Sequence, residues 1–168
     1  VMVWSDGMIA VSDFVLRHML KNFGTDPERI RTVHNGVSPA LYDEGRAAEM
    51  NMKYRSELGI GRDTRVVGMV ASLTPRKGYI HFLAAAEEIK KQYGDVVFLG
   101  VGGGPQREEL ESKARELGLD GCFRFLGVRN DVRDLMAAFD VFVLSSSSEG
   151  LPYVILEAMC MTKPIVTT

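Results

Sequence analysis

The stretch Ser145–Met161, SSSSEGLPYVILEAMCM, decides how the rest of the chain is interpreted. It follows the apolar run Val141–Leu144, which predicts a buried strand, and it begins with a Ser-rich turn. Pro152 then indicates a helix start, because proline fixes φ and lacks the N–H that a first helical turn leaves unpaired. The first amides of such a helix carry partial positive charge, so this loop is suited to an anion.

Two carboxylates, Glu149 and Glu157, flank this predicted helix start. Between Pro152 and Glu157 a helix rises about 7.5 Å, so the two side chains are expected to contact different parts of one elongated ligand. This arrangement argues against the paired acid and base of a glycoside hydrolase, whose carboxyls face a single bond. The simpler alternative makes Glu157 an exposed helix residue and Glu149 a charge that caps the helix.

Composition describes an ordinary globular chain of 168 residues, 46% hydrophobic and 25% charged, long enough for one domain and part of another. The formal net charge of −2 gives no reason to expect a nucleic-acid partner. Cys122 and Cys160 lie in apolar surroundings without Cys-x-x-Cys spacing, which predicts reduced core residues of a cytosolic protein. No run approaches the ~20 apolar residues of a membrane span.

Strand-like and helix-like segments alternate along the chain. Residues 7–34 predict one β-α-β unit with Ser12 as a helix N-cap, and residues 38–58 predict a polar connection followed by a helix. Farther on, strands are predicted at Val66–Ala71, Val96–Val101, Phe123–Leu126, Val141–Leu144 and Pro164–Val166. Helices are predicted at Gly78–Gln92, from the residues after Pro105 to Leu117, at Val132–Phe139 and at Pro152–Met161. The alternation predicts an α/β fold: a Rossmann-like parallel sheet with helices on both faces.

Ligands of such sheets bind beyond the carboxyl ends of the strands, which makes four loops informative: Ser72–Gly78, Gly102–Pro105, Gly127–Asn130 and Ser145–Leu151. In the first, Arg76 and Lys77 precede a predicted helix, with Ile80, Leu83, Ala84 and Ile89 available for burial. Cations at such a position suit a diphosphate, although a solvated charged turn is the alternative.

The glycine run Gly102–Gly104 also follows a strand and precedes a helix. The dinucleotide fingerprint Gly-x-Gly-x-x-Gly fails here, because Arg107 occupies its last position. We therefore expect a tight turn, and an NAD-dependent oxidoreductase is an alternative that rests on this run alone. His18, His34 and His81 are scattered and no Asp-x-Asp pair occurs, so neither a metal nor another cofactor is predicted.

Taken together, the motifs make the chain resemble family 4 of the retaining glycosyltransferases, which have the GT-B fold. Residues 149–159, EGLPYVILEAM, resemble the Glu-x₇-Glu signature of that family. Other motifs follow in the family's order: IAVSDF at 9–14, VHNGV at 33–37, LTPRKG at 73–78, GGGPQREEL at 102–110, FLGVRNDV at 125–132 and AFDVFVL at 138–144.

The resemblance implies two Rossmann-like lobes with the active cleft between them. Residues 1–45 would end the N-terminal lobe, 46–63 would connect the lobes, and 64–168 would form the donor-binding lobe, truncated at its C-terminal end. The chain begins with Val1 and stops soon after Pro164–Val166, and a parallel sheet rarely closes on a bare strand. We therefore expect a piece of a longer protein.

By matching position, the resemblance also implies a site for a UDP- or GDP-sugar. Glu157 would bind the ribose and Glu149 the hydroxyls of the sugar, while Lys77 and the amides of Gly150–Leu151 would neutralise the diphosphate. The backbone at Val128 and Arg129 would meet the base. The remaining donor-binding positions are Ser72, Arg76, Gly78 and Pro152.

The implied reaction retains the anomeric configuration, with Lys77 and Glu149 as the catalytic residues and the leaving diphosphate helping to deprotonate the acceptor. Ser72 stands where the family usually has Arg, and Arg76 partly compensates for that lost charge. Thr162 replaces a usual glycine, and Gly103 a frequent Asp.

The expected function is transfer of a sugar from a nucleotide-sugar to an acceptor, and the alternative is a nucleotide-sugar-binding fragment without turnover. We expect a cytoplasmic location, compatible with peripheral association at the inner face of the membrane through the missing N-terminal lobe. Exposed apolar strand and cleft surface is also compatible with self-association of the truncated chain. The acceptor, the sugar and the base stay open.

Overall fold

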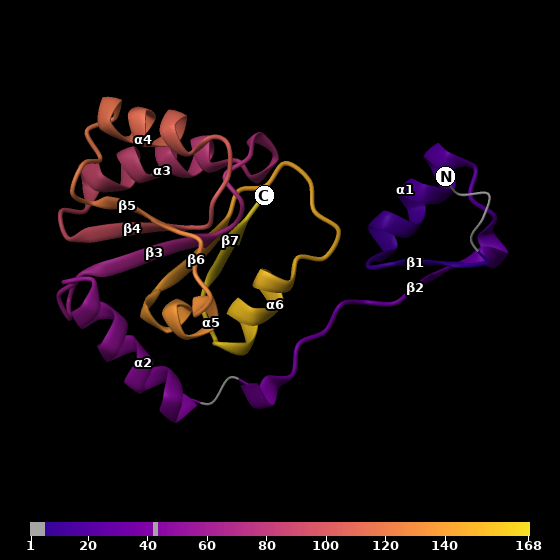
Figure 1. The fold of residues 1–168 in the computed structure, drawn as a ribbon, viewed down its shortest axis with the longest axis horizontal. Coiled ribbons are helices and arrows are strands. Elements are labelled where there is room, and N and C mark those ends of the chain that lie inside the picture. Colours follow the sequence, from indigo (N-terminus) through magenta and orange to yellow (C-terminus); the bar gives the residue numbers. More distant parts are fainter. Residues whose placement is uncertain (1–5, 42–43) are drawn as a thin grey trace.

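A computed structural model describes residues 6–41 and 44–168, which form two α/β units in sequence order (Figure 1). The first unit contains β1 (Met8–Ala10), α1 (Asp13–Phe23), the 3₁₀ turn η2 (Pro27–Arg29) and β2 (Ile30–Thr32). Its two strands pair in parallel. The Ser12 hydroxyl accepts a hydrogen bond from the Val15 amide at 3.3 Å, which confirms the predicted N-cap.

The second unit contains a five-stranded parallel sheet in the order β5-β4-β3-β6-β7. Its strands are β3 (Arg65–Val70), β4 (Val96–Val101), β5 (Phe123–Gly127), β6 (Val141–Leu144) and β7 (Ile165–Thr167). Its helices are the 3₁₀ turn η4 (Pro75–Lys77), α3 (Tyr79–Gln92), α4 (Arg107–Glu116), α5 (Val132–Leu135), the 3₁₀ turn η5 (Met136–Ala138) and α6 (Tyr153–Cys160). The Rossmann-like parallel sheet predicted from the sequence is therefore confirmed.

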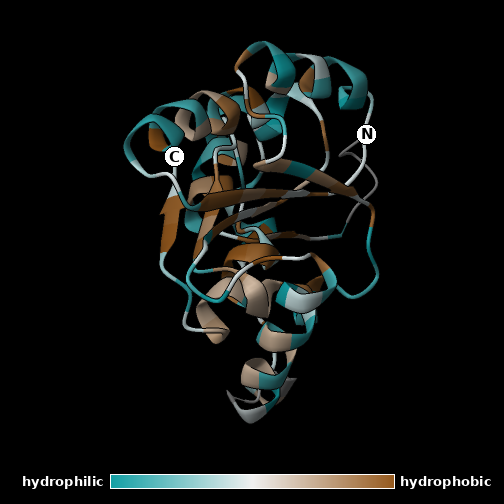
Figure 2. Cartoon of the chain, turned by 90° about the vertical axis from the view of Figure 1, so that its left-hand side faces the viewer, coloured by the Kyte–Doolittle hydropathy of each residue, from teal (hydrophilic) through white to brown (hydrophobic). Residues whose placement is uncertain are grey.

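Helices cover both faces of this sheet: α3 and α4 lie on one side, and α5, α6 and α2 (Glu44–Glu57) lie on the other (Figure 1). Its strands are mainly hydrophobic, whereas hydrophilic residues gather on the surrounding helices and loops (Figure 2). Beneath α3 the ring of Phe82 packs against Phe123 and Phe98, with centroids 5.1 and 6.0 Å apart. Burying such rings supplies much of the driving force for folding.

α2 follows the 3₁₀ turn η3 (Pro39–Leu41) in the chain and packs firmly on the second unit. Arg55 is 7% exposed. Its side chain donates to the carbonyls of Gly61 and Thr64 at 3.0 and 2.8 Å. It also pairs with Asp140 at 2.8 Å, and the Tyr54 hydroxyl donates to Asp131 at 2.8 Å. These buried polar contacts fasten α2 to the sheet, because an unpaired guanidinium at this depth would be costly.

The predicted buried face of α3 is partly wrong. Ile80 is 43% exposed and Ala84 is exposed as well. Gly78, with φ of 69°, starts the helix so that the next residue points into the sheet, and Ile80 is then turned by about 100° away from it. The buried face consists of Tyr79, Phe82, Leu83 and Ala86.

Two predicted helix limits also change. Pro152 has φ of −73° and ψ of 128°, so it is the N-cap of α6 and lies before the first helical turn. The single helix predicted for Val132–Phe139 is a four-residue α-helix followed by a 3₁₀ turn. In both places the chain changes conformation within a few residues, which hydrophobic periodicity does not detect.

The packing predicts that Gly68→Ala destabilises the second unit. A Cβ at Gly68, in the middle of β3, would lie 2.2 Å from the ring of Phe139, so the ring or the strand must shift. We expect the free energy of unfolding to fall by about 1–3 kcal/mol, the usual cost of overpacking a core. Gly94→Ala is the control, since a Cβ there meets nothing within 4 Å. Urea denaturation measures both, and equal stabilities would contradict the described packing.

Candidate functional site

The second unit has one position where the order of strands reverses. β3 pairs with β4 on one side and with β6 on the other, so the chain builds the sheet outward from β3 in two directions. In parallel α/β sheets, ligands bind at the carboxyl ends of the strands beside such a reversal. The two loops that meet there follow β3 and β6, and they contain most of the site residues predicted from the sequence.

The turn after β3 is shaped to touch the loop after β6. Gly78 has φ of 69°, and a Cβ on it would lie 1.9 Å from the carbonyl oxygen of Ser145. The Ser145 hydroxyl donates to the Gly78 carbonyl at 2.9 Å, and the Ser147 amide donates to the Arg76 carbonyl at 2.9 Å. Glycine is therefore required at 78 both by the backbone conformation and by the close approach of the two loops.

The contact between the loops brings two cations to one carboxylate. The Lys77 ammonium donates a hydrogen bond to Glu149, and the side chains of both residues are largely buried, 16% and 20% exposed. The Arg76 guanidinium lies 4.0 Å from the other oxygen of Glu149 and donates to the Ser148 carbonyl at 3.2 Å. Three predicted site residues thus form one cluster at the strand reversal.

Electrostatics keep Glu149 ionised at neutral pH. Burial raises the pKa of its carboxyl, but the hydrogen bond from Lys77 and the charges of Lys77 and Arg76 outweigh burial, so the pKa lies below its usual value. The cluster therefore holds two positive charges and one negative charge. An added anion would meet a net positive field at this edge of the sheet.

The glycines after β4 pack against the loop after β3. A Cβ on Gly102 would lie 2.0 Å from the Ala71 carbonyl oxygen, and one on Gly104 would lie 2.4 Å from that of Leu73. The Tyr79 hydroxyl, buried below, lies 3.2 Å from the Val101 carbonyl oxygen and 3.4 Å from that of Ala71. The glycine run is an irregular segment in close contact with the loop after β3, and the predicted tight turn falls one position later, at Pro105 and Gln106. Tyr79 supports the site from below, and no motif in the sequence pointed to it.

The loop after β5 exposes Val128 and anchors Arg129. Val128 is 78% exposed. The Arg129 side chain binds Asp131 at 2.6 and 2.8 Å and Glu57 at 3.3 Å, and its guanidinium lies 5.7 Å from the ring centre of Tyr54. These bonds turn the Arg129 side chain toward α2 and away from the exposed Val128.

The same network shifts three ionisation equilibria. The hydrogen bond from Arg129 holds the pKa of the Asp131 carboxyl well below its usual range, and the bond to Asp131 raises the pKa of Arg129. Burial, together with its hydrogen bond to Asp131, raises the pKa of Tyr54 to about 12. The loop after β5 is therefore held to α2 by groups whose protonation does not change across the neutral range: a charged Arg129 and Asp131 and an uncharged Tyr54.

Besides Gly78, Val128, Arg129 and Pro152, four more predicted residues lie outside the ion cluster: Glu157, Ser72, Gly150 and Leu151. Glu157 is half-buried on α6, and its carboxylate has no partner among the residues that the structure describes. Ser72 is exposed, with its hydroxyl 3.5 Å from that of Thr74. Gly150 and Leu151 approach the first unit, where the Asn35 amide donates to the Leu151 carbonyl at 2.7 Å. In the sequence, Asn35 stands out only as part of the VHNGV motif at 33–37, which does not indicate this contact.

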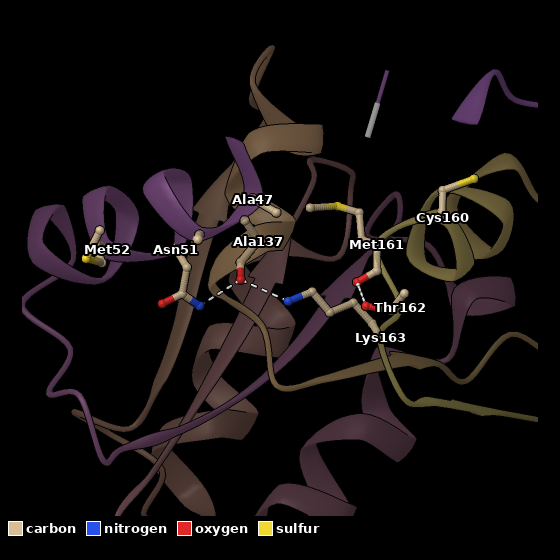
Figure 3. A pocket seen from close by; sticks show the side chains of 9 residues that line it. Ala47, Asn51, Met52, Ala137, Cys160, Met161, Thr162 and Lys163 are labelled. Carbon is tan, nitrogen blue, oxygen red and sulfur yellow. Dashed lines mark hydrogen bonds between the residues drawn. The ribbon is translucent and has the colours of Figure 1, made fainter. Parts of the chain in front are cut away.

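In the described part of the chain, two of the cavities that lie away from this cluster are bordered by α2. One, of about 500 Å³, is lined by α2, η5 and the turn between α6 and β7, where Asn51 and Lys163 donate to the Ala137 carbonyl at 2.8 and 2.9 Å (Figure 3). The other, of about 560 Å³, lies along α2 beside Arg55 and Asp140. Across residues 6–41 and 44–168, no three His, Cys, Asp or Glu side chains gather to hold a metal ion. No helix in these ranges is long and apolar enough to span a bilayer.

A parallel β-α-β unit precedes a Rossmann-like sheet at whose strand reversal a basic turn meets an acidic loop, and this is the order expected of the GT-B class. Residues 64–168 match the family model described as "Glycosyl transferases group 1", and residues 1–41 match the one described as "Glycosyltransferase Family 4". The first match covers more than half of the chain, which therefore belongs to this family of glycosyltransferases.

Individual relatives agree with this assignment. The chain is 31% identical over 151 residues to the putative glycosyltransferase EpsF of Bacillus subtilis, covering 89% of this chain and 38% of EpsF. It is 27% identical to the lipopolysaccharide glucosyltransferase WaaG of Escherichia coli, covering 98% and 44%. Each comparison spans less than half the length of the relative.

Solved structures match just as broadly. HepE of Anabaena, crystallised with UDP-glucose, superimposes with a TM-score of 0.85 at 29% identity over 97% of this chain and 44% of that one. The crystal structure of WaaG gives a TM-score of 0.84 at 26% identity, covering 95% and 43%. The GT-B fold predicted from the sequence is thus confirmed for the part of it that this chain represents.

The ion cluster predicts a pH-dependent effect of Glu149→Gln on stability. Because the folded-state pKa of Glu149 lies below its ordinary value, the ion pair stabilises the protein above that ordinary value and loses this effect as the pH falls through the folded-state pKa. We expect Glu149→Gln to cost about 1–2 kcal/mol at neutral pH and much less at about pH 3.

Urea denaturation at the two pH values measures this difference. Glu116→Gln is the matched control, since Glu116 pairs with Lys113 on the surface and is 60% exposed. Such an exposed pair contributes little. A loss for Glu149→Gln that is the same at both pH values would contradict the ionised pair.

Proposed function

We propose that this chain is the nucleotide-sugar-binding part of a glycosyltransferase that moves a sugar from a UDP- or GDP-sugar to an acceptor with retention of configuration. The observation that carries the proposal is the meeting of Lys77, Arg76 and Glu149 at the strand reversal. The family assignment supports it, and so do the UDP and UDP-glucose in the HepE crystals.

In this proposal the diphosphate of the donor takes the place of Glu149 as the partner of Lys77. A diphosphate carries more negative charge than one carboxylate, so it competes well for the ammonium and for Arg76 beside it. The amides of Gly150–Leu151 and the Ser72 hydroxyl add uncharged donors. Glu149, released from Lys77, then accepts hydrogen bonds from the hydroxyls of the sugar.

The rest of the donor extends along the strand ends. Glu157, half-buried and without a partner among the described residues, binds the ribose hydroxyls. The backbone of Val128 and Arg129 meets the base, since the Arg129 side chain is bound to Asp131 and Glu57. Gly78 and Pro152 shape the two loops and leave room for the phosphates.

The proposed reaction exchanges one bond to the anomeric carbon for another. The bond to the phosphate oxygen breaks, the acceptor oxygen bonds to the same face of the sugar, and the acceptor proton passes to the leaving phosphate. Negative charge grows on the diphosphate in the transition state, where Lys77 stabilises it more than in the ground state. These steps use no metal and no further cofactor.

The division into residues 1–45, 46–63 and 64–168 belongs to the same proposal. So do a cytoplasmic location, peripheral association with the inner face of the membrane, and an acceptor bound partly by a more complete N-terminal lobe. The alternative is that these residues bind the nucleotide without turnover. Sugar transfer by the isolated 168 residues would contradict that alternative. An NAD-dependent oxidoreductase is not retained, because the chain belongs to a glycosyltransferase family.

We expect Lys77→Ala in the full-length protein to weaken the binding of UDP or GDP by about 10- to 100-fold. Removal of a charge-assisted hydrogen bond to phosphate costs about 1.5–3 kcal/mol. Calorimetry measures the dissociation constant, with Lys91→Ala as the control because Lys91 pairs with Glu87 and Glu88 on the exposed end of α3. An unchanged affinity for Lys77→Ala would contradict the phosphate site.

Glu157→Ala tests the ribose contact separately. We expect it to weaken nucleoside diphosphate binding about 10-fold, in line with the loss of hydrogen bonds to a charged group, and to leave pyrophosphate binding unchanged. Competition between pyrophosphate and a labelled nucleotide gives both affinities, and Glu116→Ala is the control for lost surface charge. Equal losses for both ligands would place Glu157 at the phosphates and contradict its proposed role.

A further inference from the structure

A direct hydrogen bond joins the loop after β6 to the first unit. The side-chain amide of Asn35 donates to the carbonyl of Leu151 at 2.7 Å, across 116 residues of sequence, and the contact is partly buried. Asn35 lies just beyond β2, and the loop between β6 and α6 extends from its sheet toward α1 (Figure 1). The bond therefore links the strand-end side of one unit to the loop that carries Glu149.

The adjacent residue shows how closely the two units approach. A Cβ on Gly150 would lie 2.9 Å from Cγ2 of Val11 and 3.2 Å from Cγ2 of Val15. The φ of Gly150 is not positive, so the backbone conformation at this position does not require glycine. A Cβ here would press against these two side chains, because α1 and the segment before it lie directly against the loop.

The opposite side of the same loop is fixed to the second unit. The Ser147 amide donates to the Arg76 carbonyl at 2.9 Å, and the Ser145 hydroxyl donates to the Gly78 carbonyl at 2.9 Å. The loop thus lies between the basic turn after β3 and the first unit. Its position relative to the basic turn depends on Ser145 and Ser147, whereas its position relative to the first unit depends on Asn35.

We propose that Asn35 is a positioning residue that seats the Ser145–Leu151 loop on the first unit, with Gly150 providing the close approach. This inference rests on the proposed function, because seating the loop matters only if a donor binds beside Glu149. The charges on the phosphates of that donor are bound by Lys77 and Arg76, which do not contact Asn35. The Gly150–Leu151 amides belong to the loop that Asn35 contacts, but the bonds of Ser145 and Ser147 still hold that loop to the basic turn when Asn35 is lost. Loss of Asn35 therefore separates the two units at this loop and changes nucleotide affinity by no more than about twofold.

A disulfide trap in the full-length protein tests the contact directly. Val11→Cys and Gly150→Cys are combined, with Cys122→Ser and Cys160→Ser removing the two free cysteines of this chain. A Cβ on Gly150 lies close enough to the Val11 side chain for a disulfide to form. We expect Asn35→Ala in this background to slow disulfide formation about fivefold, since one hydrogen bond contributes about 1 kcal/mol. Mass spectrometry after timed oxidation measures the rate.

Asn22→Ala is the matched control, because the Asn22 amide bonds to His18 within α1, away from the second unit. The same variants, with the native residues at 11 and 150, are titrated with whichever of UDP and GDP the wild type binds more tightly. We expect both Asn35→Ala and Asn22→Ala to stay within about twofold of the wild-type affinity, which is below the effect of one lost hydrogen bond.

The disulfide rate and the nucleotide affinity together distinguish a failure of the positioning role from a failure of the proposed function. Disulfide formation that is absent, or equally fast with and without the Asn35 amide, overturns the positioning role whatever the nucleotide affinities are. A slower disulfide together with an equal loss of nucleotide affinity also overturns it, because Asn35 would then act on the binding site as a whole. If neither nucleotide binds the wild type, the proposed function fails, and with it the role of the contact in that function. The oxidation rate still reports the contact itself.

Discussion

The ion cluster at the strand reversal depends on the contact between Gly78 and the carbonyl of Ser145. The two residues belong to the loops that follow β3 and β6, and no other side chain fits where a Cβ would lie 1.9 Å from a backbone oxygen. Through this contact the Lys77 ammonium reaches Glu149, although the two residues are 72 positions apart. The parallel sheet supplies the framework, since β3 and β6 are neighbours with their carboxyl ends together. The ion cluster therefore forms because β3 and β6 are neighbours and because Gly78 lets their two loops touch.

Much of this arrangement could be predicted from residue patterns. The alternation of β-branched runs with helical segments was sufficient for the sheet, and the loops with Lys77 and Glu149 follow from the rule for strand ends. The buried residues of α3 were harder to predict. A period of 3.6 residues fixes which residues share a face of the helix, but it does not fix which of two adjacent faces points toward the sheet. The left-handed Gly78 sets that choice, and the exposed Ile80 is the result.

Contacts between the two units could not be predicted from local patterns at all. Asn35-Gly36 has the composition of a turn, and nothing in it indicates that the amide binds Leu151 in the second unit. The Arg129 side chain is a similar case. Its bonds to Asp131 and Glu57 depend on α2 lying beside the loop after β5, which is a property of the tertiary structure.

The buried Arg55 on α2 limits where segments of such proteins can be recombined to make chimeras. Its bonds to Gly61, Thr64 and Asp140, with those of Tyr54 and Asn51, make α2 an integral layer of the second unit. A recombination junction placed between α2 and β3 would separate a buried guanidinium from its acceptors. A junction before Glu44 would keep this network whole. Chimeras made from members of this family should therefore inherit α2 together with the sheet that it covers.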